Sequence, residues 1–239
     1  MLNDEIRQQK DKFRQMDMKQ KLQYIWDYYK WPILITLFVI ILLSSFIHDR
    51  VTAKKDVLYV VMLDSAAQTA GDSDMLDDFS GTLSDFDPDK EELFLDATIN
   101  TEGNGSIGYT YMQKVLAQYN IGSIDVTIAP RETIEKFAEF QAFGDLRDLL
   151  PKDLYDEILS SGREILYTDY EDPATGEIKH DIPIAVNISD SGPILKGFTD
   201  IEGNRQDYFG SDCYIAISPN TSYLEHSIAF LRYMLEKGE

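Results

Sequence analysis

The residues best placed to bind a ligand are polar side chains that directly follow apolar, strand-like runs of the sequence. In an open parallel sheet, ligands bind beyond the carboxyl ends of the strands. One rim of the expected sheet therefore carries the candidate ligand-binding residues, which are Asp64, Ser65, Asn100, Ser106, Arg131 and Asn187.

The segment between Asn100 and Ser106 contains a glycine-rich loop, Gly103-Asn104-Gly105, in front of an expected helix. Free backbone N–H groups at the start of a helix can bind an anion. Glu102 lies beside this loop, and the loop contains no phosphate-binding lysine. Ordinary capping of the helix by Ser106 is therefore the favoured interpretation.

An Asp-x-Asp-x-Asp motif begins at Asp85, and Asp96 occupies the twelfth position, an arrangement similar to a calcium-binding loop. Lys90 stands where such a loop requires glycine, and the twelfth ligand would lie in a strand. An acidic, solvated loop is therefore favoured. The single cysteine and the three histidines exclude multi-cysteine clusters and leave little for zinc, so we predict no metal site and no cofactor.

The possible nucleophiles are Ser189, Cys213 and Ser218, and the possible general bases are His180 and His226. No G-x-S-x-G signature surrounds any of them. Cys213 lies inside an apolar run, which favours a place in the core. His226 stands on the last expected helix, where a surface or boundary position is favoured over a role as a base. We therefore predict no catalytic residues and a protein that is not an enzyme.

The composition is typical of a globular protein, with 239 residues of which 44% are hydrophobic. The formal net charge is −20, because 42 Asp and Glu side chains outnumber 22 Lys and Arg side chains. Carboxylates repel the phosphate backbone, and no basic stripe offsets them. Nucleic acid is therefore excluded as a partner.

An uncharged, mostly apolar run occupies residues 31–47, and as a helix it extends over roughly 25 Å. Aromatic side chains crowd its N-terminal side, as they do at a membrane interface. We therefore expect a membrane-spanning helix. The expected division of the chain is a cytoplasmic amphipathic tail over 1–30, a transmembrane helix over 31–48, a linker over 49–56 and an extracytoplasmic α/β domain over 57–239.

Seven basic residues precede the apolar run, which predicts an N-terminus in the cytoplasm. The expected location is the bacterial cell membrane, crossed once, with the lipid bilayer as a partner. A cleaved signal peptide with its cleavage site at 51–53 is the alternative. Within the tail, Asp17 and Gln20 are spaced as a weak capping pair at the start of a helix.

Three apolar runs predict buried strands, at 57–63, 93–99 and 124–129. Helical patterns lie between them, and the first helix is expected to be capped within Asp72-Ser73-Asp74. We therefore predict an α/β domain with a mainly parallel sheet flanked by helices on both faces. The remaining expected elements are a hairpin of 164–170 with 177–188, a strand at 213–218 and a helix at 220–235.

Two segments carry a resemblance to a known family. Residues 124–158 contain a strand, a helix that begins at its end, an aromatic–glycine step and a D-L-x-x-L-L run that begins at Asp145. Residues 213–235 contain a strand and then a helix with Ala229-Phe230-Leu231 and Met234-Leu235, which is similar to the family's helix of the form x-A-x-x-F-L-x-x-L. In pattern and order the chain resembles type 2 extracellular solute-binding proteins.

This resemblance implies a periplasmic-binding-protein-like lobe. Members of the family have two lobes around a cleft. Here only about 24 residues, 190–213, separate the expected crossover strand from the closing strand. A complete second lobe does not fit into that length. The resemblance therefore implies a relative shortened to about one lobe, which puts closure of two lobes around a ligand in doubt.

Two functions follow from these expectations. The first is a membrane-anchored, non-enzymatic domain that binds a small solute or a protein partner. The alternative is an interaction or assembly subunit of a cell-envelope or transporter complex that binds no small molecule. A concave rim at the strand ends favours the first, and an exposed apolar patch favours the second.

Overall fold

The computed structural model describes residue 14 and residues 17–52, 54–67, 70–71, 73–101, 106–171, 175–200 and 202–236. Two compact units make up the chain, Met1–Ala53 and Lys54–Glu239. Most of the expected tail before Asp17, and Ala53 of the alternative cleavage site, lie outside the described residues.

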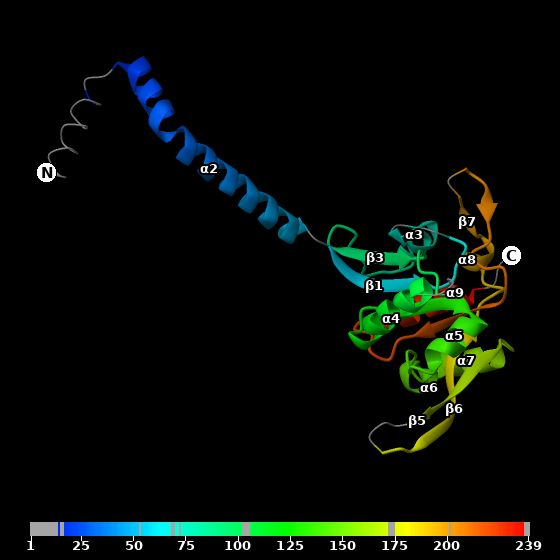
Figure 1. The fold of residues 1–239 in the computed structure, drawn as a ribbon. Coiled ribbons are helices and arrows are strands. Elements are labelled where there is room, and N and C mark those ends of the chain that lie inside the picture. The colour runs from blue at the N-terminus through cyan, green and yellow to red at the C-terminus, as the bar shows by residue number, and fades with distance from the viewer. Residues whose placement is uncertain are drawn as a thin grey trace. The chain divides into compact units, whose positions relative to one another are not determined.

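The first unit contains the helix α2 (Met18–Thr52; Figure 1). The backbone N–H of Asp17 donates to Oε1 of Gln20 at 3.2 Å, which confirms the expected capping pair at the start of this helix. Pro32 lies inside the helix. Many large apolar side chains between Trp31 and Leu43 are exposed.

Among the described residues, no helix is both long enough and apolar enough to cross a membrane. This finding contradicts the predicted transmembrane helix over 31–48. It contradicts equally the predicted bacterial cell-membrane location, the single pass and the division into cytoplasmic and extracytoplasmic parts.

The second unit is built on a seven-stranded sheet with the order β2-β3-β1-β4-β9-β6-β5. Its parallel part consists of β1 (Lys55–Met62), β3 (Glu91–Asp96) and β4 (Val126–Pro130), with β1 in the middle. The helices α3 (Asp74–Ser80) and α4 (Ser106–Asn120) connect these strands. The three strands and the alternation with helices were expected from the apolar runs, and the structure confirms them.

The rest of the sheet is antiparallel, so the predicted mainly parallel sheet is wrong. The short β2 (Ala70–Gly71) runs antiparallel to β3 at one edge. On the other side, β9 (Cys213–Ile217) lies antiparallel to both β4 and β6 (Ile178–Asn187). The hairpin partner β5 (Ile165–Glu171) forms the second edge. The last strand enters between two strands of opposite direction to itself, which makes the sheet mixed.

Shorter elements complete the second unit. The helices after β4 are α5 (Arg131–Ala138), α6 (Leu146–Leu149) and α7 (Lys152–Ser160). Between β6 and β9 lie α8 (Gly192–Leu195) and a two-stranded hairpin of β7 (Phe198–Thr199) and β8 (Arg205–Gln206). The final helix is α9 (Leu224–Leu235), shorter at its start than the sequence pattern predicted.

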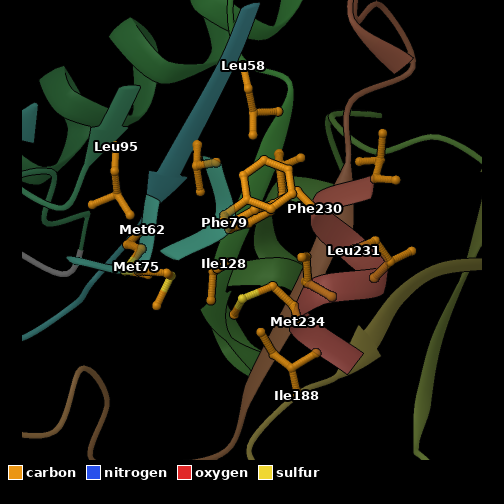
Figure 2. Close-up of a cluster of buried hydrophobic side chains, with 14 of the residues drawn as sticks. Leu58, Met62, Met75, Phe79, Leu95, Ile128, Ile188, Phe230, Leu231 and Met234 are labelled. Carbon is orange, nitrogen blue, oxygen red and sulfur yellow. The ribbon is translucent and has the colours of Figure 1, made fainter. Parts of the chain in front are cut away.

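Alternate side chains of β1 point to opposite faces of the sheet, and each face has its own core. Leu58 and Met62 pack in a cluster with side chains of α3 and α9, and Figure 2 shows this cluster. Phe79 of α3 meets Phe230 of α9 edge-on, with ring centroids 5.0 Å apart. Val61 belongs to the opposite cluster, which contains side chains of α4 and α5.

This packing fixes where the chain changes direction. The connection that follows β1 leads to α3 on one face, and the connection that follows β4 leads to α5 on the other. Because β1 and β4 are neighbours, their connections separate and leave a crevice beyond the carboxyl ends of both strands. Such a switch point is where open α/β sheets bind ligands.

Candidate functional site

Asp64, two residues after the end of β1, lies at this crevice and holds three segments together. Its carboxylate accepts hydrogen bonds from the Thr101 N–H at 2.5 Å, the Thr101 hydroxyl at 2.7 Å and the Thr133 hydroxyl at 2.7 Å. Thr101 follows β3, and Thr133 lies in the first turn of α5. Asp64 has a φ of 57°, a left-handed conformation that aspartate tolerates better than most residues. The carboxylate therefore fixes the positions of Thr101 after β3 and of the first turn of α5 relative to the end of β1.

Arg131, the first residue of α5, lies beyond the carboxyl end of β4 and is held there by a cluster of polar side chains. Its guanidinium forms an ion pair with Glu164 and donates to the Tyr214 hydroxyl at 2.8 Å. The Tyr214 hydroxyl in turn donates to Oε2 of Glu164 at 2.7 Å. Glu135 adds a second ion pair at 3.4 Å, and the guanidinium carbon lies 5.1 Å from the centre of the Tyr214 ring.

These contacts fix the charges of the cluster. The hydrogen bond from Tyr214 and the ion pair with Arg131 hold the pKa of Glu164 below its usual range. The ion pair with Glu164 raises the pKa of Arg131. Both groups therefore stay charged near neutral pH, and much of the positive charge of Arg131 is already compensated.

A cavity of about 430 Å³ opens at the rim beside Asp64. Its walls are Asp64, Pro130, Arg131, Glu132, Phe209, Gly210, Ser211 and Asp212. Among the described walls, three carboxylates line this space against one guanidinium that Glu164 already compensates. The electrostatics therefore favour an uncharged or positively charged ligand with hydrogen-bond donors and disfavour an anion.

The structure places Ser65, Asn100 and Asn187 outside the described walls of this cavity. Asn187 ends β6, pairs across the sheet with Tyr214 and accepts a hydrogen bond from the Ser189 N–H at 2.9 Å. Ser65 is buried, and its hydroxyl donates to the Tyr208 carbonyl at 3.1 Å and accepts from the Ala67 N–H at 3.1 Å. These residues shape the rim.

Asn100 is exposed after β3. Residues 102–105 of the glycine-rich loop lie outside the described residues, and Ser106 starts α4 with a side chain that is not described. The prediction for this loop and the expected cap therefore remain predictions. Of the six candidates, Asp64 and Arg131 are brought to the cavity.

The acidic motif at Asp85 has other partners. Asp87 forms an ion pair with Lys90 at 2.6 Å and accepts a hydrogen bond from the Asp89 N–H at 3.1 Å. These contacts lower the pKa of Asp87, and the contact with Lys90 has the larger effect. No group of three or more His, Cys, Asp or Glu side chains among the described residues has a geometry that could hold a metal.

The hydrogen bonds described for the candidate nucleophiles Ser189, Cys213 and Ser218 do not include His180 or His226. Cys213 is 1% exposed, which confirms its expected place in the core, and burial raises the pKa of its thiol to about 12. His180 contacts Asp169 at 2.9 Å, and the His226 ring contacts the Tyr223 ring. A thiol with so high a pKa is a poor nucleophile at neutral pH.

Several residues at the rim were missed in the sequence. Glu132 and Asp212 line the cavity, while Thr133 binds Asp64. Glu132 follows the predicted Arg131, and the same argument from the strand end could have predicted it. Asp212 gave no signal, because its position depends on β9 lying beside β4, which is a long-range pairing.

No protein-family model, curated protein or solved structure matches this chain. The arrangement of the sheet and its rim is therefore the basis for any functional assignment.

Proposed function

We propose that the second unit, Lys54–Glu239, is a non-enzymatic binding module for a small polar solute that is uncharged or positively charged. The solute binds in the cavity between the ends of β1 and β4. The observation that carries this proposal is the position of the cavity, at the point where the connections after two neighbouring parallel strands separate to opposite faces. A volume of about 430 Å³ is in the usual range for a small-molecule site.

The walls support the choice of ligand. Glu132 and Asp212 are exposed and supply acceptors for hydroxyl or ammonium groups. Phe209 supplies an apolar surface on which the carbon skeleton of a sugar or an amine can pack. Arg131 serves as a fixed wall, because Glu164 and Tyr214 hold its guanidinium.

The rim is prepared for binding before the ligand arrives. The hydrogen bonds of Asp64 join the ends of β1, β3 and α5, so the walls that these elements carry need little reorganisation. A binding module of this kind works with one lobe and needs no closure of two lobes. This interpretation agrees with the resemblance to a shortened solute-binding protein, which stays a proposal.

A thermal-shift screen of the full chain tests the proposal, in a mild detergent that covers the exposed apolar side chains of α2. The probes are neutral sugars, polyols and simple amines, with acetate and phosphate as anionic controls. We expect a saturable rise in melting temperature with at least one neutral or cationic probe, since ligand binding stabilises the native state. Asp212→Asn removes a wall carboxylate and reduces the shift.

The matched control is Asp156→Asn, because Asp156 is an exposed carboxylate on α7 outside the cavity. It leaves the shift unchanged. A shift with phosphate alone, or a shift that both variants reduce equally, contradicts the proposal. A flat screen on a folded chain also contradicts it and favours the alternative, a protein partner. Edge strand β5 and the half-exposed Tyr167 are where contacts with such a partner would then be sought.

A further inference from the structure

A second cavity, of about 470 Å³, lies on the α3 side of the rim. Its walls come from α3, from the end of α8, from the β7–β8 hairpin and from α9. Gly197 holds the hairpin close to α8: it has a φ of 63°, and a Cβ there would lie 2.2 Å from the Gln206 carbonyl oxygen. The hairpin therefore forms a wall of defined position.

Charged groups of both signs face this cavity. Lys196 and Asp78 form an ion pair at 2.6 Å and so compensate each other. Asp74 and Asp77 of α3 and Arg205 of β8 also line the cavity, and none of these three has an ion-pair partner among the described residues. The cavity thus presents two carboxylates on one wall and a guanidinium on another.

A polar group without a partner lies in the same walls. The hydroxyl of Tyr233, on α9, is buried and has no hydrogen-bond partner among the described residues. Burial, with smaller effects of Asp78 and Glu236, raises the pKa of Tyr233 to about 12. The phenol is therefore protonated at neutral pH and is a hydrogen-bond donor whose proton no described residue accepts.

One segment separates this cavity from the cavity beside Asp64. The side chain of Tyr208 lines the α3-side cavity, and the next residue, Phe209, lines the other. The Tyr208 carbonyl accepts hydrogen bonds from the Ala66 N–H at 2.8 Å and from the Ser65 hydroxyl at 3.1 Å. Ser65 thus fixes the dividing segment to the end of β1, and the two cavities have different walls.

We infer that the α3-side cavity is a second binding site, for a small zwitterion that carries an ammonium group and a carboxylate. The ammonium group binds at Asp74 and Asp77, and the carboxylate binds at Arg205, whose planar fork suits that group. A ligand of one charge satisfies one wall only, and for this reason a zwitterion fits better than a simple amine or a simple acid.

Isothermal titration of the full chain tests this inference with three probes of increasing charge separation, glycine, β-alanine and 4-aminobutyrate. Butylamine carries the ammonium group alone, and butyrate carries the carboxylate alone. We expect at least one zwitterion to bind with saturation, and to bind about threefold or more tightly than either control, because each ion pair at exposed groups is worth roughly a threefold change in affinity. No saturable binding by any zwitterion overturns the inference, as does equal binding of butylamine that Asp212→Asn leaves unchanged.

Variants separate the two cavities. Arg205→Gln and Asp74→Asn each weaken binding of the zwitterion about threefold, whereas Asp212→Asn, in the wall of the other cavity, leaves it unchanged. Circular dichroism checks that each variant is folded, which is expected because Arg205 and Asp74 are exposed. Binding that Asp212→Asn abolishes and Arg205→Gln does not places the zwitterion beside Asp64. That outcome overturns this inference and leaves the proposed function intact.

Discussion

Replacing Asp64 by alanine tests whether its carboxylate fixes the rim. The substitution removes the acceptor of three hydrogen bonds, from the N–H and hydroxyl of Thr101 and from the hydroxyl of Thr133. Thr101 and Thr133 are 4% and 3% exposed, so water cannot readily replace the carboxylate. The hydroxyls can rotate to other acceptors, but the N–H cannot. Leaving this buried N–H without an acceptor costs about 1–3 kcal/mol, and alanine at a φ of 57° adds roughly 1 kcal/mol.

We therefore expect Asp64→Ala to lower the free energy of unfolding by about 3 kcal/mol. Asp64→Asn is the matched variant, because asparagine tolerates the same backbone conformation and keeps one carbonyl acceptor. It should cost less than half as much. Urea unfolding followed by the near-ultraviolet circular dichroism of tyrosine is the suitable measurement. Tryptophan fluorescence is not, since both tryptophans, Trp26 and Trp31, belong to the first unit.

A double-mutant cycle with Thr133→Val sharpens the test. If the hydrogen bond between Asp64 and Thr133 contributes, the effects of the two substitutions are less than additive by about 1 kcal/mol. An Asp64→Ala variant within 0.5 kcal/mol of the parent chain, roughly the effect of an ordinary surface substitution, would refute the role assigned to this carboxylate.

Two further predictions concern buried charged groups elsewhere in the second unit. Arg163, whose side chain is 6% exposed, donates to the Asn187 carbonyl at 3.0 Å and to the Leu235 carbonyl at 2.9 Å, and it pairs with Asp190. Arg163→Met should lower the free energy of unfolding by about 3 kcal/mol in the same urea assay, and a loss below 1 kcal/mol would contradict this. Burial raises the pKa of Asp125 in the folded state above its value in the unfolded chain. The protonated carboxyl therefore contributes fully to the free energy of unfolding below the unfolded pKa, and this contribution is lost as the pH rises through the folded pKa. The stability of the parent chain relative to Asp125→Asn should therefore fall between about pH 3 and neutrality, and a rise over that interval would show that the direction is wrong.

Local signals in the sequence are sufficient for the early elements of the second unit. The apolar run after Asp56 gives β1, and Ser73, in the expected capping segment, accepts a hydrogen bond from the Leu76 N–H at 3.2 Å at the start of α3. Both features depend on residues a few positions apart. The capping pair of Asp17 and Gln20 at the start of α2 is local in the same way.

Strand direction cannot be read in this way. The run that begins at Cys213 has the composition of a buried strand, and it is one: all five of its residues are buried. Nothing in these residues shows that the strand enters between β4 and β6 and runs antiparallel to both. That pairing depends on matching apolar side chains on both faces of the strand and on the length of the connection before it. For this reason the prediction of a mainly parallel sheet failed at this strand.

The same long-range pairing completes the candidate site. Asp64 and Arg131 could be predicted because each follows its own strand in the parallel part of the sheet. Asp212 and Phe209 reach the cavity because they lead into β9. The sequence argument therefore found the half of the site that local rules determine, and it missed the half that depends on where the last strand pairs.

A site with this construction has a consequence for affinity. Solute-binding sites that enclose their ligand bury most of its surface, and that burial supplies much of the binding free energy. Here exposed side chains, among them Glu132 and Asp212, form part of the wall, so a ligand keeps contact with water on one side. Hydrogen bonds and ion pairs at exposed groups contribute little each. Binding is therefore expected in the micromolar to millimolar range, and screens that stop at low micromolar ligand would miss it.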